Sequence, residues 1–178
     1  MLSREGEKHV APEQDIIDHK GYRRGVGIVV WDGRDRVLLA RRSDRRGWQF
    51  PQGGVRQGEP PRDAMYRELK EELGLDPSQV REVARMGRWV SYKLPPRYQR
   101  SRAPRCIGQK QLWWLLRLTC ADERVRPDLA EEPEFDDWSW VDYWHPAEEV
   151  VFFKRSVYRQ VLEEFGERVG LRATVNMR

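Results

Sequence analysis

The chain has 178 residues, of which 39% are hydrophobic and 35% charged, so it can bury the core of one domain. Its eight Trp residues argue against a disordered chain, and no apolar run approaches the roughly 20 residues of a membrane-spanning helix. The two cysteines, Cys106 and Cys120, exclude a disulfide scaffold, and the formal charge of +4 is too small to identify a partner. These properties favour a soluble, cytoplasmic protein.

The two ends of the chain differ from its centre. Residues 1–20 are polar and mixed in charge, without the apolar segment of a secretory signal, and we expect them to form a flexible N-terminal arm. An apolar, β-rich pattern begins near Gly25. We therefore expect one folded domain over residues 21–170 and a C-terminal tail over residues 171–178.

Strand patterns dominate the first part of this domain. Val26–Trp31 and Val37–Ala40 are rich in apolar and β-branched residues, and Asp32–Gly33 between them favours a turn. The two runs therefore predict a hairpin. Trp48–Phe50 predicts a further short strand, which ends at Pro51 because proline cannot donate to a central ladder.

A helix is predicted over Pro61–Leu73. Proline is tolerated in a first helical turn, Asp63 suits the positive N-terminal end, and Gly74 is placed to end the helix. The later pattern predicts strands near residues 83–93, 111–119 and 138–141, a second helix over 154–169, and loops over 95–108 and 122–132. This order predicts an α/β fold in which a mixed β-sheet packs against helices.

The first predicted helix carries a cluster of carboxylates. Glu68, Glu71 and Glu72 are three or four residues apart or adjacent, so they can share one helical face, although like charges so placed repel. Hard divalent cations such as Mg²⁺ bind such oxygen ligands together with substrate phosphates. Glu59 can add a carboxylate from the preceding loop, and Arg67 can hold carboxylates by hydrogen bonding. On these residues alone, an ordinary solvated acidic helix remains the alternative.

The whole segment from Gly53 to Leu75 resembles the Nudix box, G-x5-E-x7-R-E-U-x-E-E-x-G-U, in which U is apolar. The resemblance implies the Nudix fold, a mixed β-sheet sandwiched between α-helices, in which the box forms a loop–helix–loop. It also implies hydrolysis of a nucleoside diphosphate linked to another group, with a divalent metal, Mg²⁺ or Mn²⁺, as the cofactor. The matching positions are Gly53, Glu59, Arg67, Glu68, Leu69, Glu71, Glu72, Gly74 and Leu75.

Segments outside the box narrow the resemblance to one branch of the family, the bacterial RNA pyrophosphohydrolases. Members of this branch trim the 5′ triphosphate or diphosphate end of RNA to a monophosphate and expose the transcript to decay. Close relatives hydrolyse dinucleoside polyphosphates and share much of the pattern. The similar segments, between about residues 21 and 165, include Gly21–Arg23, Ala40–Arg42, Trp48–Gly54, Tyr92–Pro95, Cys106–Gln111, Pro133–Asp136 and Phe153–Arg155.

The resemblance assigns chemical roles to several of these residues. The candidate metal ligands are Glu68, Glu71, Glu72 and Glu134. The candidate catalytic residues are Glu68, Glu72, Glu134 and Arg67, and one of the glutamates is expected to assist the attacking water. The pattern leaves open which glutamate is the base and how many ions bind.

Five further residues are candidates for binding the substrate. Arg23, Arg42, Lys93 and Lys154 are expected to bind the polyphosphate, because guanidinium and ammonium groups pair well with phosphate. Phe153 is expected to stack on the 5′-terminal base, with Arg42 on the other face of that base. Core packing beside its apolar neighbours is the alternative for Phe153.

Three functional hypotheses follow. The first is an RNA 5′ pyrophosphohydrolase, which the arginine-rich segment 97–105 favours because a transcript offers many phosphates beyond the reacting end. The second is a hydrolase of dinucleoside polyphosphates, which needs the same glutamates. The third is a nucleotide- or RNA-binding module without catalysis, which the intact box disfavours. Any protein activator, the oligomeric state and the preferred 5′ nucleotide remain open.

Overall fold

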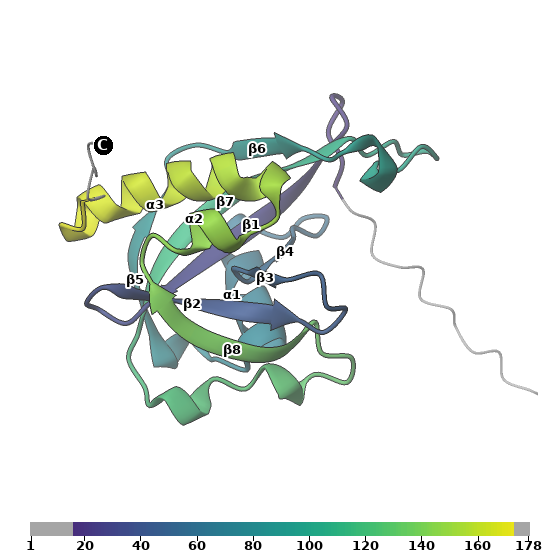
Figure 1. Ribbon diagram of the computed structural model, residues 1–178. Helices are drawn as coiled ribbons and strands as arrows, with labels where there is room; N and C mark the ends of the chain where they lie inside the picture. Colours follow the sequence, from purple (N-terminus) through teal and green to yellow (C-terminus); the bar gives the residue numbers. More distant parts are fainter. Residues whose placement is uncertain (1–15, 173–178) are drawn as a thin grey trace, which may run out of the picture.

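Two long strands, β1 (Tyr22–Trp31) and β7 (Gly108–Leu118), run parallel through the centre of a mixed sheet (Figure 1). The computed structural model describes residues 16–172. The main path of the sheet is β3-β2-β1-β7-β5, and β4, β8 and β6 add to β1, β2 and β7. The remaining strands are β2 (Arg36–Arg42), β3 (Trp48–Gln49), β4 (Gln52–Gly54), β5 (Val80–Arg85), β6 (Val90–Lys93) and β8 (Phe135–Asp142).

Helices cover both faces of this sheet, so the predicted α/β sandwich is confirmed. Helix α1 (Pro61–Leu73) contacts β1 and β4 and lies behind the sheet in Figure 1, whereas α2 (Pro146–Glu149) and α3 (Arg155–Val169) lie in front. The central strands are therefore apolar on both sides, as is typical of buried parallel strands. Val26, Ile28 and Val29 of β1 are all fully buried.

An aromatic cluster joins α3 to the sheet. The Tyr158 ring lies 4.7 Å from the ring of Phe50 and 5.7 Å from that of Trp113, between centroids. The backbone N–H of Phe50 donates to the Tyr158 hydroxyl at 2.8 Å, so the buried phenol is paired. Gly27 lies against the Trp113 ring, where a Cβ atom would overlap the indole. A large side chain on β7 thus requires the smallest residue on β1.

Helix α1 begins at Pro61 and ends at Leu73, as predicted. Gly74 follows with φ +69°, and its backbone N–H donates to the Lys70 carbonyl at 3.0 Å. This left-handed conformation favours glycine. The first strand, in contrast, begins at Tyr22 rather than Val26, because its parallel pairing with β7 extends back to Gly108.

The single strand predicted near residues 83–93 was wrong, since two strands occupy this region. β5 pairs with the later part of β7 and β6 with its beginning, and residues 86–89 separate them. Met86 turns its side chain into the core, fully buried, while its N–H still donates to the Trp113 carbonyl at 2.9 Å. Gly53 and Gly54 belong to a further strand, β4, and pair with Val26 and Gly25 of β1.

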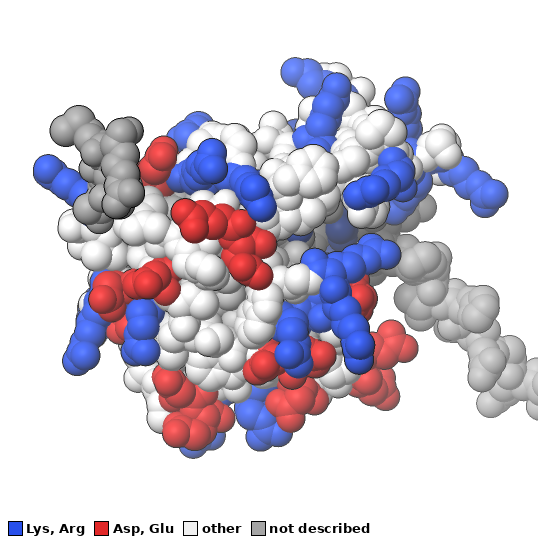
Figure 2. Space-filling model, viewed as in Figure 1, with Lys and Arg blue, Asp and Glu red and all other residues white. Residues whose placement is uncertain are grey.

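The segments predicted as loops contain local structure. Residues 122–132 hold two 3-10 turns. Residues 95–108 project from the sheet beyond β6, with a 3-10 turn at Pro96–Tyr98 and an isolated bridge between Arg100 and Cys106 (Figure 1). Lys and Arg side chains gather over this projection (Figure 2).

Residues 16–20, the described part of the predicted arm, contact the sheet. Ile17 forms a bridge with Arg23, and the Lys110 ammonium donates to the Asp18 carboxylate. Residues 1–15 and 173–178, the rest of the predicted arm and most of the predicted tail, lie outside the described residues. Among residues 16–172, no helix is both long and apolar enough to cross a bilayer.

Replacing Gly27 by alanine is expected to destabilise the protein. The added methyl group overlaps the buried Trp113 ring, and overpacking of this kind costs about 1–3 kcal/mol of unfolding free energy. Urea unfolding followed by Trp fluorescence measures the change. Gly87→Ala is the matched control, because a Cβ at Gly87 meets nothing within 4 Å. Equal stability of the two variants would contradict the packing argument.

Candidate active site

A pocket of about 670 Å³ opens between β4, α1 and the segment that precedes β8. Basic side chains reach it from β1 and β2, and acidic ones from α1 and from the residues before β8. It therefore presents charges of both signs to one cavity. Its lining residues are Arg23, Arg42, Gln52, Gly53, Gly54, Val55, Arg56, Arg67, Glu68, Glu71, Glu72, Gln109, Ala130, Glu132 and Glu134.

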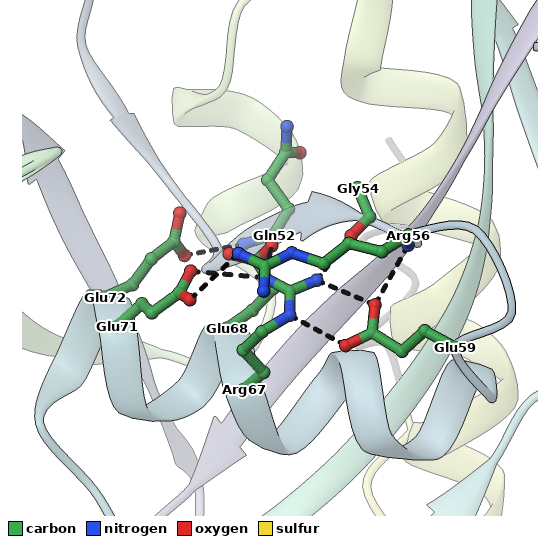
Figure 3. A network of polar contacts seen from close by, with 8 residues as sticks. All are labelled: Gln52, Gly54, Arg56, Glu59, Arg67, Glu68, Glu71 and Glu72. Carbon is green, nitrogen blue, oxygen red and sulfur yellow. Dashed lines mark hydrogen bonds and ion pairs between the residues drawn. The ribbon is translucent and has the colours of Figure 1, made fainter. Parts of the chain in front are cut away.

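Arg67 is the centre of the polar network at this site (Figure 3). Its Nε and Nη2 donate to the two carboxylate oxygens of Glu59, at 2.8 and 3.0 Å. Its Nη1 donates to Glu68 at 2.6 Å and to Glu71 at 3.2 Å, and Nη2 also donates to the Gly54 carbonyl at 2.7 Å. All five N–H groups of the guanidinium therefore have acceptors within the protein, which makes Arg67 a positioning residue.

Glu59 is turned towards this arginine. Besides the two bonds from Arg67, its Oε2 accepts the backbone N–H of Arg56 at 2.9 Å. The Arg67 guanidinium holds the pKa of Glu59 below its usual value. The carboxylate that the sequence suggested as an addition to the metal centre instead fixes the arginine and the loop between β4 and α1.

Glu68 lies in a tight space beneath β4. Its side chain is 11% exposed, and a Cβ atom at Gly53 would overlap its carboxylate. The glycine is thus needed so that the helix can bring this carboxylate against the strand. Burial raises the pKa of Glu68 to about 7, although Arg67 opposes the shift, and nearby Glu71 and Glu134 add to it.

Glu72 is buried one turn further along α1. Its Oε2 accepts the backbone N–H of Gln52 at 2.8 Å, whereas its buried Oε1 has no partner among the described residues. The carboxyl groups of Glu72 and Glu134 lie within hydrogen-bonding reach of each other. Burial, Glu134 and Glu68 together raise the pKa of Glu72 well above its ordinary value. The nearby cations, Arg42 and Lys154, therefore do not offset the burial of this carboxyl.

The donor set of this cluster fits a hard divalent cation. Glu68, Glu72 and Glu134 offer only carboxylate oxygens, the ligand type of Mg²⁺ and Mn²⁺, and the bare Oε1 of Glu72 faces no other partner. Within residues 16–172, no three acidic, histidine or cysteine side chains form a ready ligand shell. Arg67 holds Glu68 and Glu71 in the structure, so we expect these side chains to turn when an ion binds.

Three of the predicted basic residues lie near the carboxylate cluster, two in the pocket lining and one buried. Arg23 and Arg42 line the pocket, and the Arg23 guanidinium passes so close to Gly54 that a Cβ there would lie 2.6 Å from it. Arg42 pairs with Asp44, its Nη2 lying 2.6 Å from the carboxylate. Lys154 is buried behind Gln52 and donates to its Oε1 at 3.3 Å, and burial lowers the pKa of Lys154 to about 8.

Lys93 and Phe153 lie outside the pocket lining. Lys93 is exposed at the end of β6. Phe153 is half-buried, with its ring centroid 6.0 Å from that of Tyr92 and 5.8 Å from that of Tyr98. Its ring therefore packs on other aromatic rings at the surface. The role predicted for it stays a prediction.

Sequence reasoning missed the glutamines of the site. Gln52 binds Glu72 through its backbone and reaches Lys154 and Gln111 through its side chain. Gln109 lines the pocket and accepts a hydrogen bond from the Tyr92 hydroxyl at 3.0 Å. Both residues lie in segments that resemble the RNA pyrophosphohydrolases, but an uncharged amide does not by itself indicate a role in binding or catalysis.

Comparison with known proteins places this geometry in a family. Residues 21–165 match the NUDIX domain. The chain belongs to the Nudix family. The RNA pyrophosphohydrolase of Halorhodospira halophila is 55% identical over 149 residues, which make up 84% of this chain and 82% of that protein. The RNA pyrophosphohydrolase of Methylococcus capsulatus is 54% identical over 150 residues, or 84% of this chain and 78% of that protein.

Solved structures share the Nudix fold. The E. coli dihydroneopterin triphosphate pyrophosphohydrolase superposes with a TM-score of 0.63 at 25% identity, covering 80% of this chain and 93% of that one. A C. elegans Ap4A hydrolase in a binary complex gives a TM-score of 0.57 at 20% identity, covering 81% and 98%, and shows the fold alone. The chain is therefore a Nudix hydrolase, and such enzymes generally need divalent metal ions.

The buried carboxyls predict that the metal-free Nudix domain loses stability as the pH rises. The pKa of Glu68 is about 7 in the folded chain against 4.5 in the unfolded chain, so the folded state binds the proton more tightly between these values. The stabilisation is complete below about pH 4.5 and is lost as the pH rises through about 7, by up to about 3 kcal/mol. Urea unfolding in EDTA between about pH 5 and pH 8 measures it.

The control for this prediction is Glu68→Gln, which keeps the shape of the side chain and removes its proton. We expect a shallower fall of unfolding free energy with pH in this variant. An identical slope in both proteins would show that the Glu68 carboxyl is ionised throughout the range.

Replacing Arg67 by lysine is expected to abolish hydrolysis and to lower the unfolding free energy by about 2–3 kcal/mol. One ammonium cannot satisfy both oxygens of Glu59 together with Glu68 and Gly54, so buried acceptors lose their donors. Denaturant unfolding and turnover are measured on the same preparation. Arg62→Lys is the matched control, because Arg62 is 63% exposed and pairs with Glu82 at the surface. Similar losses of turnover and unfolding free energy in both variants would contradict the positioning role of Arg67.

Proposed function

We propose that this Nudix hydrolase is an RNA 5′ pyrophosphohydrolase. It converts 5′-tri- or diphosphorylated RNA to 5′-monophosphorylated RNA in the cytoplasm and so promotes mRNA decay. The observation that carries the proposal is the 50–55% identity to RNA pyrophosphohydrolases, such as that of Ectopseudomonas mendocina, where the likeness spans 88% of this chain and 99% of that protein. The pocket supports the proposal, because it is lined by both arginines and glutamates.

The glutamates of the pocket are the proposed metal ligands. Glu68, Glu71, Glu72 and Glu134 would hold Mg²⁺ or Mn²⁺, with Arg67 releasing Glu68 and Glu71 for this purpose. When bound, the cation polarises phosphoryl oxygens and neutralises charge on the leaving phosphate.

The reaction that these residues support is attack of water on a phosphorus atom of the anhydride. A new P–O bond forms to the water oxygen, the P–O–P bond breaks, and phosphate or pyrophosphate leaves. The Glu72–Glu134 pair takes the proton of the water, since buried Glu72 lies beside exposed Glu134 and Glu72 Oε1 is free to accept. Glu68 would also hold the metal ion, and Arg67 fixes the positions of the carboxylates on this face of α1.

Basic residues around the pocket are proposed to bind the phosphates at the 5′ end of the RNA. Arg23 and Arg42 face the pocket from two adjacent strands and are placed to contact the polyphosphate. Lys154 and Lys93 are proposed to contact phosphates further out, Lys154 after Gln52 moves aside. Phe153 is proposed to stack on the 5′-terminal base, with Arg42 on its other face.

Two other functions were open from the sequence. Dinucleoside polyphosphate hydrolysis needs the same glutamates, and the likeness to an Ap4A hydrolase extends only to the fold. A binding module without catalysis would not need an unpartnered carboxylate oxygen beside two other carboxyls. RNA remains the favoured substrate.

A side-by-side assay tests the proposal. With Mg²⁺, triphosphorylated RNA is expected to yield monophosphorylated RNA together with phosphate or pyrophosphate, and diadenosine tetraphosphate is expected to turn over more slowly. EDTA should stop both reactions. Products are resolved by thin-layer chromatography of 5′-labelled RNA.

Glu72→Gln serves as the control, with turnover expected to fall by at least about a hundredfold because the proton acceptor and a ligand are lost. Fast hydrolysis of the dinucleotide with none of RNA would reverse the choice of substrate. Undiminished turnover by Glu72→Gln would show that the carboxylate cluster is not the reaction centre.

A further inference from the structure

An exposed row of aromatic rings leads away from the pocket. Phe152 is 61% exposed and Tyr98 is 41% exposed, although both are large and apolar. Each packs against Phe153, with ring centroids 5.4 and 5.8 Å from it. Phe153 in turn lies 6.0 Å from Tyr92, whose hydroxyl bonds to Gln109 of the pocket wall. The rings are therefore continuous with the cavity that holds the glutamates.

A basic segment borders this row, and its residues 95–105 do not line the pocket. Between Glu82 and Asp122 the chain has nine Lys or Arg residues and no Asp or Glu. The Arg97 guanidinium lies over the Tyr98 ring, 4.8 Å from its centroid. In the described part of the chain, no carboxylate forms an ion pair with Arg97, Arg102 or Arg105. Lys and Arg side chains gather over this projection in Figure 2.

This combination fits single-stranded nucleic acid. Exposed rings stack on successive bases whatever their identity, because every base has a π-face, and nearby arginines bind the phosphates between them. Exposed Phe and Tyr side chains lie next to water in the free protein, so covering them with bases is favourable. The pocket, the rings and the basic segment follow one another in the order of the 5′ phosphates, first bases and downstream backbone of RNA.

We propose that Phe152 and Tyr98, with Arg97 and Arg102 of the projecting segment, form a binding track for the RNA nucleotides that follow the 5′-terminal one. The track rests on the proposed function in that it extends the RNA site beyond the base assigned to Phe153. It makes the protein favour a transcript over a mononucleotide or a dinucleoside polyphosphate. A partner protein is disfavoured, because the surface combines its rings with unneutralised arginines.

A binding measurement tests the track directly. The shorter probe is a 3′-fluorescein-labelled nucleoside 5′-monophosphate and the longer one a 3′-fluorescein-labelled, 5′-monophosphorylated single-stranded RNA of about ten nucleotides, both read by fluorescence polarisation. Phe152→Leu and Tyr98→Leu keep apolar contact but remove the rings. The double variant is expected to weaken binding of the longer RNA about fivefold or more, with little change for the shorter one. Phe152→Trp is expected to retain affinity.

The arginines have a separate signature. Replacing Arg97 and Arg102 together by alanine should reduce the slope of log K against log salt by roughly 0.7 for each RNA phosphate that an arginine no longer neutralises. Arg168→Ala is the matched control, because Arg168 is exposed on the last turn of α3, whereas Phe152 and Phe153 precede its first turn. Folded variants with unchanged RNA affinity and unchanged salt slope would overturn the track. A surface that binds a partner protein instead of RNA would give this result.

Kinetics separate this inference from the proposed function. With triphosphorylated RNA of about ten nucleotides, the ring variants should raise KM about fivefold and leave kcat unchanged, because they do not touch the reacting phosphates. If the wild-type protein binds the longer RNA through these residues but does not hydrolyse it, the proposed function fails and the track stands. If it hydrolyses RNA with the same KM in every variant, the track fails and the function stands.

Discussion

The structure of the site depends on one half-buried cation. Arg67 uses all of its N–H groups to hold Glu59, Glu68, Glu71 and the Gly54 carbonyl. Three segments meet there: the end of β4, the loop before α1 and the helix itself. Without the guanidinium, like charges on one helical face would repel across a space that excludes most water. The planar fork of arginine therefore does what a point charge cannot.

The same interaction explains why the site is both folded and reactive. Arg67 lowers the pKa of Glu59, but burial raises the pKa of Glu68 despite Arg67, and burial with Glu134 raises the pKa of Glu72. A Nudix domain without metal thus folds around carboxyl groups whose ionisation is unfavourable. A divalent ion would relieve this cost, which couples metal affinity to proton release and to stability. The burial of these carboxyl groups both lowers the stability of the metal-free domain and favours metal binding.

The sequence was sufficient where local rules govern. The bounds of α1 followed from Pro61 and Gly74, and the spacing of the box indicated the family. It failed where distant contacts decide: the break between β5 and β6 occurs because Met86 turns into the core and both strands pair with β7. Likewise, nothing local shows that Glu59 would face an arginine, or that Lys154 would be buried behind an amide.

The parallel pairing of β1 with β7 sets an order of events for a growing chain. Arg23 on β1 lies beside Gln109 on β7, and both line the pocket. The whole box is made before β7 leaves the ribosome, yet Gln109 of the pocket lining arrives only with that strand and Glu134 only after it. Contacts so far apart in sequence form slowly. A nascent chain that ends before β7 holds every glutamate of the box but lacks Gln109 and Glu134 of the pocket, so synthesis itself delays the onset of activity.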